Sequence, residues 1–322
     1  MRSVTVVHCL IAIILASVMA GVTAQTYPDR PVKIIVGFPP GGSSDTVARI
    51  VADKLTASLG QPVIVENKPG AGGVTASEWV ARAPKDGYTL LLATAGHSTA
   101  AAMRKQLPFD TVRDFTWIST VTTYPFVIAT APNAPYGSLA ELIAAAKRAP
   151  GKITYSSAGV GTSHHLLGEW LNAEAGIDLV HVPFKGGTSP LTEIVSGRVD
   201  VMFETMTLTL PQIKAGNLKA LAVTAPGPVD FLPGVPAASQ TVPGFVLQSW
   251  LGIAGPADLP PAVLDRIGRD LRAALEMPDV RKRLADLGGT AAPVTPEAMR
   301  AQVEREIARW RALVESRKIE RQ

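Results

Sequence analysis

The sequence predicts an α/β protein of two lobes joined by a hinge of two chain crossings. Patterns typical of strands and of helices alternate along most of the 322 residues, which favours helices packed on a largely parallel sheet. Two long extended segments, 118–130 and 245–254, interrupt this alternation and are the expected crossings between the lobes. Hydrophobic residues make up 47% of the chain and charged residues 18%, so the chain can bury a sizeable core.

Residues 1–24 have the composition of an export signal. Arg2 supplies a positive start, residues 4–19 form an apolar run, and Val22-Thr23-Ala24 fits the small-residue rule for cleavage. We therefore expect a mature chain that starts at Gln25 and is located in the periplasm. Cleavage four residues earlier and an uncleaved membrane anchor are the alternatives.

The first lobe is expected from residues 25–121. Its strands are continuous apolar runs rich in β-branched residues, and its helices carry apolar residues on one face. The expected strands are 32–38, 63–66 and 88–94, and the expected helices are 43–59 and 73–82.

The same alternation restarts in residues 122–254, which are expected to form the second lobe with its hinge crossings. The expected strands are 152–156, 179–182, 199–203 and 218–223, and the expected helices are 139–147, 163–174 and 190–196. Residues 255–322 are expected to contain only helices, at 261–276, 279–287 and 296–316, which complete the first lobe by packing on it.

Charge and cysteine content exclude several classes of function. The formal net charge is +4, and basic residues are mixed with acids rather than forming a stripe with interleaved aromatics, so a nucleic-acid partner is not expected. A slightly basic surface mildly favours anionic ligands. The single cysteine, Cys9, lies in the expected signal, so the mature chain has no disulfide and no cysteine metal site.

Motifs for catalysis or metal binding are missing from the sequence. There is no Gly-x-Ser-x-Gly elbow and no His-Glu-x-x-His motif. His164 and His165 are adjacent, so on a helix they diverge by about 100° and cannot chelate one metal. We expect no catalytic residue, no metal and no cofactor.

Two glycine-rich loops are the strongest candidates for a binding site. Residues 38–45 (FPPGGSSD) follow an expected strand and open a helix, and Ser43 or Ser44 can cap that helix. Residues 156–163 (SSAGVGTS) join a strand to a helix in the other lobe. Free N–H groups at helix starts attract anions, so two such loops facing across a cleft could hold a small anion. The alternative is that both are ordinary strand-to-helix turns.

Three further loops are weaker candidates, because a loop of this kind is more often an ordinary connection. The first follows the strand 88–94 and contains Ala95 and His97. The second contains Lys185, which could supply a positive charge to an acidic ligand. The third contains Glu204, at the end of the strand 199–203.

Four segments together resemble the substrate-binding proteins of tripartite tricarboxylate transporters, the Bug family. They are 27–42, 66–73, 84–90 and 182–187. The resemblance runs over essentially the whole mature chain. It implies a Venus-flytrap fold like that of type II periplasmic binding proteins. It also implies capture of a small organic acid, typically a carboxylate, and a membrane permease as partner for a monomeric receptor.

The resemblance also implies which residues meet the ligand carboxylate. The matching positions in this sequence are Phe38, Gly41, Gly42, Ser43, Asp45, Ser157, Ala158, Gly159 and Thr162. Two residues depart from the family's usual pattern: Phe184 stands where Tyr is usual, and Glu204 stands where Asp is common. The identity of the ligand can therefore not be inherited from one relative. A periplasmic sensor module and a secreted hydrolase are the alternative functions.

Overall fold

The computed structural model describes residues 27–184 and 189–321. Its strands are β1 (Val32–Val36), β2 (Val63–Asn67), β3 (Thr89–Thr94), β4 (Phe115–Thr130), β5 (Thr154–Ser157), β6 (Val180–Pro183), β7 (Val201–Thr205), β8 (Lys219–Val223), β9 (Gln248–Pro256) and β10 (Thr290–Ala291). Its α-helices are α2 (Ser43–Leu59), α3 (Val74–Ala81), α4 (Ala95–Met103), α5 (Leu139–Arg148), α6 (Ser163–Ala175), α7 (Ser189–Val195), α8 (Met206–Lys214), α9 (Pro261–Glu276), α10 (Pro278–Asp286) and α11 (Pro296–Ser316). Short 3₁₀ turns lie at Ala71–Gly73 and Ala238–Gln240.

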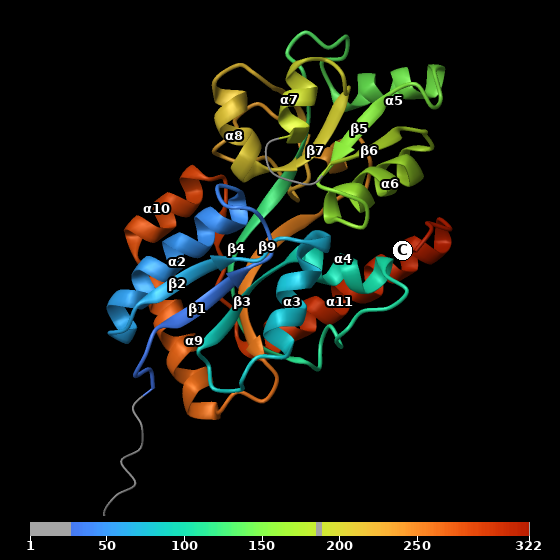
Figure 1. Cartoon of the computed structure of the whole chain (residues 1–322). Helices are drawn as coiled ribbons and strands as arrows, with labels where there is room; N and C mark the ends of the chain where they lie inside the picture. Colours follow the sequence, from blue (N-terminus) through green and yellow to red (C-terminus); the bar gives the residue numbers. More distant parts are fainter. Residues whose placement is uncertain (1–26, 185–188, 322) are drawn as a thin grey trace, which may run out of the picture.

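The chain forms two lobes connected by the long strands β4 and β9 (Figure 1). One lobe contains β1, β2 and β3 with α2, α3 and α4, and the other contains β5, β6 and β7 with α5 to α8 (Figure 1). The strands follow one another in the order β2-β1-β3-β9-β4-β7-β5-β6, and β8 and β10 pair with β4 off this path.

The first lobe forms around β1, whose apolar side chains are buried because α2 and α3 pack against the strand. β1 pairs in parallel with β2 and with β3. After β1 the chain enters α2, whose buried apolar residues recur at helical spacing and face the core; they are Val47, Ile50, Val51, Leu55 and Leu59. Gly60 ends α2 with a φ of 71°, a conformation that glycine adopts without steric cost.

The two crossings pair with each other as well as with the lobes. In β4, Phe115–Pro125 runs antiparallel to β9, and Phe126–Thr130 runs antiparallel to β7 and β8. β9 also pairs with β3 in the antiparallel sense. The connection between the lobes is therefore a two-stranded antiparallel ladder.

The expectation of a largely parallel sheet is wrong at these crossings. Parallel pairs occur inside each lobe, at β1 with β2 and β3 and at β5 with β6 and β7. Every pair made by β4 or β9 is antiparallel, because these strands carry the chain from one lobe to the other in opposite directions. The expectation of only helices after residue 254 is also wrong, since β10 pairs with β4.

Two helices that begin inside the candidate loops were not expected from the sequence. α4 is buried at eight of its nine positions, so its sequence (AGHSTAAAM) has no polar face that would reveal a helical period. α8 contains Pro211, which weakens the helix signal although the helix continues through it.

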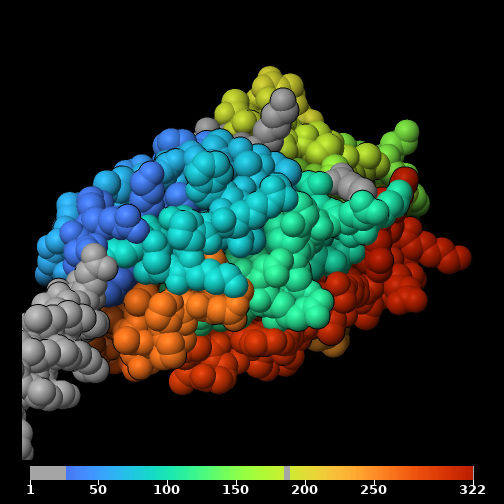
Figure 2. Space-filling model, turned by 60° about the horizontal axis from the view of Figure 1, so that its bottom comes forward, coloured from blue at the N-terminus to red at the C-terminus, as the bar shows by residue number. Residues whose placement is uncertain are grey.

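The C-terminal helices lie along the first lobe and reach the second. α9 and α10 contact α2, and α11 packs on α4. Figure 2 shows these orange and red segments along one side of the blue and cyan first lobe. Near its end, α11 places Arg309 Cζ 5.1 Å from the ring centroid of Trp170 in α6. Among the described residues, no helix has the length and apolar character needed to cross a membrane.

Candidate functional site

A cavity between the lobes is lined by the starts of four helices. Gly42 precedes α2 and Thr94 precedes α4 in the first lobe, while Thr162 precedes α6 and Thr205 precedes α8 in the second. Each helix start carries roughly half a positive charge and several N–H groups without an intrahelical acceptor. The cavity is therefore surrounded by hydrogen-bond donors, although no lysine or arginine is among the described residues that line it.

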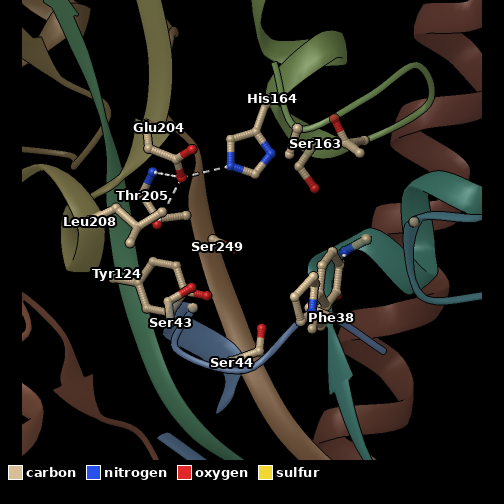
Figure 3. A pocket seen from close by; sticks show the side chains of 17 residues that line it. Phe38, Ser43, Ser44, Tyr124, Ser163, His164, Glu204, Thr205, Leu208 and Ser249 are labelled. Carbon is tan, nitrogen blue, oxygen red and sulfur yellow. Dashed lines mark hydrogen bonds and ion pairs between the residues drawn. The ribbon is translucent and has the colours of Figure 1, made fainter. Parts of the chain in front are cut away.

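The start of α2 presents its donors without a side-chain cap. Gly42 is the N-cap, and no side chain accepts a hydrogen bond from the first turn. The expectation that Ser43 or Ser44 caps this helix is thus wrong, because both residues already lie inside it. Their side chains line the cavity instead, and Figure 3 shows the Ser44 hydroxyl facing the open space.

Asp45 holds the first glycine-rich loop in shape. Its carboxylate accepts hydrogen bonds from the Gly41 amide, from Nε and Nη2 of Arg49 and from the Asn67 amide, each at 3.0 Å. Burial alone would raise the pKa of this carboxyl, but the hydrogen bonds from Arg49, Gly41 and Asn67 lower it below its usual value. Gly41 has a φ of 83°, which allows the tight turn that this bracing requires. Asp45 therefore positions the loop and does not line the cavity.

The second glycine-rich loop is held by its own hydroxyl groups. Thr162 Oγ1 donates to the Gly159 carbonyl at 2.7 Å and accepts from the His165 amide at 3.4 Å, which caps α6. Ser157 Oγ accepts from the Gly159 amide at 3.0 Å and lies 2.6 Å from Nε2 of His181. The Thr162 hydroxyl proton is thus already used within the loop.

A histidine and a glutamate meet at the second-lobe side of the cavity. His164 Nε2 lies 3.0 Å from Glu204 Oε1, and the same oxygen accepts hydrogen bonds from the amide and the hydroxyl of Thr205 at 2.7 and 3.0 Å. Both side chains are almost buried, with 16% of His164 and 6% of Glu204 exposed. Figure 3 shows this pair across the open space from Ser43 and Ser44.

The pKa of Glu204 results from opposing effects. Its burial raises the pKa, because a charge is costly to remove from water. The charge of His164 and the hydrogen bonds from His164 and Thr205 outweigh this effect and leave the pKa below the usual value. Glu204 is therefore an ionised carboxylate at neutral pH.

The structure brings about half of the candidate residues to the cavity. Those that line it are Phe38, Gly42, Ser43, Ala158, Thr162 and Glu204. Those that lie behind the lining and shape the loops or the core are Gly41, Asp45, Ala95, His97, Ser157 and Gly159. Lys185 lies outside the described residues.

His97 is a core residue. Its Nε2 lies 2.8 Å from the Thr111 carbonyl and its Nδ1 lies 3.1 Å from Ser77 Oγ. Its ring also packs against those of Phe109, Phe115 and Trp117. With both nitrogens engaged and the ring enclosed, His97 has no free atom to offer a ligand in the cavity.

Sequence reasoning missed several residues that line the cavity. Tyr124 and Ser249 come from the two crossings, and His164 and Leu208 come from α6 and α8. The interruption of an extended segment by Tyr124-Pro125 was a visible signal for the first. For His164 there was none, because its contact with Glu204 joins residues 40 positions apart.

The comparisons with known proteins identify the family and the fold. Residues 47–319 match the family described as "Tripartite tricarboxylate transporter family receptor". Protein BugT of Bordetella pertussis is 35% identical over 302 residues, which cover 93% of each chain. The solved structure of the periplasmic binding protein BugD is 35% identical with a TM-score of 0.86, and the match covers 92% of this chain and all of that one.

Two further similar structures contain ligands. One is Rpa4515 of R. palustris with adipate, at 28% identity and a TM-score of 0.87, with 92% of this chain and all of that one covered. The other is MatC of Rhodopseudomonas palustris with bound malate, at 31% identity and a TM-score of 0.83, with 89% of this chain and all of that one covered.

The two lobes, the paired crossings and the cavity between helix starts define a solute-binding protein of the Venus-flytrap class, and the expected fold class is confirmed. The chain belongs to the tripartite tricarboxylate transporter receptor family, as the resemblance in its sequence motifs predicted. Its members are solute receptors of a transporter.

Proposed function

We propose that this protein captures a small organic acid in the cavity between its lobes and delivers it to the permease of a tripartite tricarboxylate-type transporter. The observation that carries the proposal is the convergence of four helix starts on one cavity without a lysine or arginine among its described lining residues. Such a surface stabilises a carboxylate through neutral donors. The adipate and the malate in the similar structures support a carboxylate ligand here.

The ligand carboxylate is held chiefly at the start of α2. The uncapped N–H groups there and the hydroxyls of Ser43 and Ser44 provide donors on one side, and the start of α6 provides donors from the other lobe. Each hydrogen bond to a charged group contributes about 1.5–3 kcal/mol. Several such bonds are enough for micromolar binding without an arginine clamp.

The cavity suits a small ligand. Its water-accessible volume is about 80 Å³. This space is enough for several waters or for a ligand of a few carbon atoms.

The lobes close on the ligand about the β4 and β9 ladder. The moving bodies are residues 25–121 with 255–322, and residues 122–254. Donors from both bodies line the cavity, so the ligand binds most strongly when the lobes are close together. The mature protein is a periplasmic monomer that starts at Gln25; residues 1–24 lie outside the described residues. A sensor that presents the same ligand to a receptor would use the same cavity.

The protein binds its ligand without chemical conversion. Serine–histidine contacts exist at Ser77 with His97 and at Ser157 with His181, but none of these residues lines the cavity between the lobes. A nucleophile must reach its substrate to act. Among the described residues, no cluster of three or more metal-ligating side chains is present. Incubation with p-nitrophenyl esters should therefore release no nitrophenol above the buffer rate.

A thermal-shift screen over mono-, di- and tricarboxylates, amino acids and aromatic acids tests the proposal. A ligand at 100 times its dissociation constant should add about 2.7 kcal/mol to the free energy of unfolding. We expect at least one small carboxylate to raise the melting temperature. Stabilisation only by ligands without a carboxylate would contradict the proposal.

A further inference from the structure

We propose that the ligand has one carboxylate and, at its other end, a hydrogen-bond donor that faces Glu204, so that acids with a second carboxylate at that end are rejected. The inference rests on the proposed function and deepens it by naming the ligand class. The class is a monocarboxylate with a distal ammonium or amide group.

The charge of the cavity disfavours a second carboxylate on the ligand. Glu204 lines it with a buried carboxylate, and the described lining residues include no lysine or arginine that could neutralise another one. His164 is the only basic side chain among these residues, and its Nε2 is already hydrogen-bonded to Oε1 of Glu204. Its Nδ1 is buried and has no hydrogen-bond partner in the described part of the chain. A second ligand carboxylate would therefore face a like charge in a poorly solvated space.

Glu204 has hydrogen-bond acceptor capacity that the described residues do not use. All three hydrogen bonds that this carboxylate accepts from described residues end on Oε1. A carboxylate has about four acceptor sites on its two oxygens, so Oε2 can still accept from a donor. An ammonium or amide on the ligand would supply that donor, and a carboxylate would not.

The two sides of the cavity differ in their chemistry. Ser43 and Ser44 lie on one side of the cavity and Glu204 with His164 on the other (Figure 3). The donors at the start of α2 attract an anion, and the Glu204 side attracts a donor. One side of the cavity thus attracts an anion and the other attracts a hydrogen-bond donor. A ligand with a carboxylate at one end and a donor at the other fits it best.

Calorimetric titration of the mature protein with matched ligands tests this inference. The four-carbon set is succinate, succinamate and 4-aminobutyrate, and the five-carbon set is glutarate, glutaramate and 5-aminovalerate. In at least one set we expect the amide or the amine to bind at least tenfold more tightly than the dicarboxylate of equal length. A dicarboxylate that binds as tightly as its partners in both sets would overturn the inference but leave the proposed function standing. Absence of binding by every member would overturn the inference, whereas the proposed function is decided by the broader thermal-shift screen.

Variants of Glu204 identify the residue responsible. Glu204→Gln removes the charge with little change in shape. It should reduce the preference for the amide or the amine over the dicarboxylate at least tenfold. Glu204→Asp keeps the charge and should retain the preference. Glu315→Gln removes a carboxylate from an exposed site on α11 and should behave like the wild type. Circular dichroism checks that each variant folds. An unchanged preference in folded Glu204→Gln would overturn the assignment to Glu204.

Discussion

Nε2 of His164 lies 3.0 Å from Oε1 of Glu204, and this contact joins the start of α6 to the end of β7 at the edge of the cavity. Glu204 is a buried carboxylate, and removal of the His164 side chain leaves it without one of its hydrogen-bond partners. We expect His164→Leu to lower the free energy of unfolding by about 3 kcal/mol in urea denaturation. Most of this loss should be recovered by adding Glu204→Gln, which removes the stranded charge. If the double variant instead lost the sum of the two single-variant losses in unfolding free energy, the pair would not be coupled.

Thr162 is expected to matter through the loop rather than through direct contact with the ligand. Its hydroxyl caps α6 and bonds to the Gly159 carbonyl, so Thr162→Val removes both interactions. The free energy of unfolding should fall by about 0.5–2 kcal/mol, the usual cost of losing a helix cap. Thr162→Ser keeps the hydroxyl and should stay close to the wild type. A folded Thr162→Val protein with unchanged stability would contradict this role.

His97 should make the fold sensitive to acid. Burial lowers its pKa from an ordinary value of 6.5 to about 4, whereas the unfolded chain takes up the proton near the ordinary value. The unfolded state thus binds more protons between these values, and stability falls by about 1.4 kcal/mol per pH unit as the pH drops from 6.5 towards 4.

In His97→Gln the unfolding free energy should fall less steeply with decreasing pH, because one titrating group has been removed. Urea denaturation at pH 7, 6 and 5 measures this slope. His165, with a pKa lowered to about 4, and His181, with a pKa lowered to about 3, act in the same direction and remain in the variant. A slope that is unchanged in His97→Gln would disprove the contribution of His97.

The contact between α11 and α6 should favour the closed arrangement of the lobes. Arg309 Cζ lies 5.1 Å from the Trp170 ring centroid, and such cation–π contacts contribute about 0.5–1 kcal/mol at exposed sites. Arg309→Ala should therefore weaken ligand binding about two- to fivefold without changing the cavity. Arg309→Lys keeps the cation, so its ligand affinity should lie between those of the wild type and Arg309→Ala.

Solution scattering gives an independent measure of the same closure. A tight ligand should reduce the radius of gyration of the wild type, and the unliganded Arg309→Ala protein should be at least as expanded as the unliganded wild type. An identical radius with and without ligand would show that the crossings do not act as a hinge.

The sequence predicted the elements whose signals are local. The apolar face of α2 and the glycine that follows it determine that helix, so its expected bounds of 43–59 agree with the structure. α4 was missed because its positions are nearly all buried, and the antiparallel pairs of β4 and β9 depend on the path of the whole chain. The two glycine-rich loops were found because glycine and serine at a helix start are a local signal.

The sequence could not predict which polar groups of the site face the cavity and which hold its loops in shape. Ser157 and Thr162 carry hydroxyl groups like those of Ser43 and Ser44, but they form hydrogen bonds to neighbouring loop atoms, as does the carboxylate of Asp45. That difference depends on distances of about 3 Å between groups, which spacing along the chain does not determine. The pairing of His164 with Glu204 likewise arises only when α6 and β7 pack together.

The central claim is that neutral donors at helix starts, and not a cationic side chain, hold the ligand carboxylate. Calorimetric titration of a carboxylate ligand into Ser43→Ala/Ser44→Ala and into Lys185→Ala tests it most directly. Loss of one hydrogen bond to a charged group costs about 1.5–3 kcal/mol, so the double serine variant should bind at least tenfold more weakly. Lys185→Ala should bind within about threefold of the wild type, a change of under 1 kcal/mol. The account is contradicted if the serine variant binds like the wild type while Lys185→Ala, with its fold intact, abolishes binding.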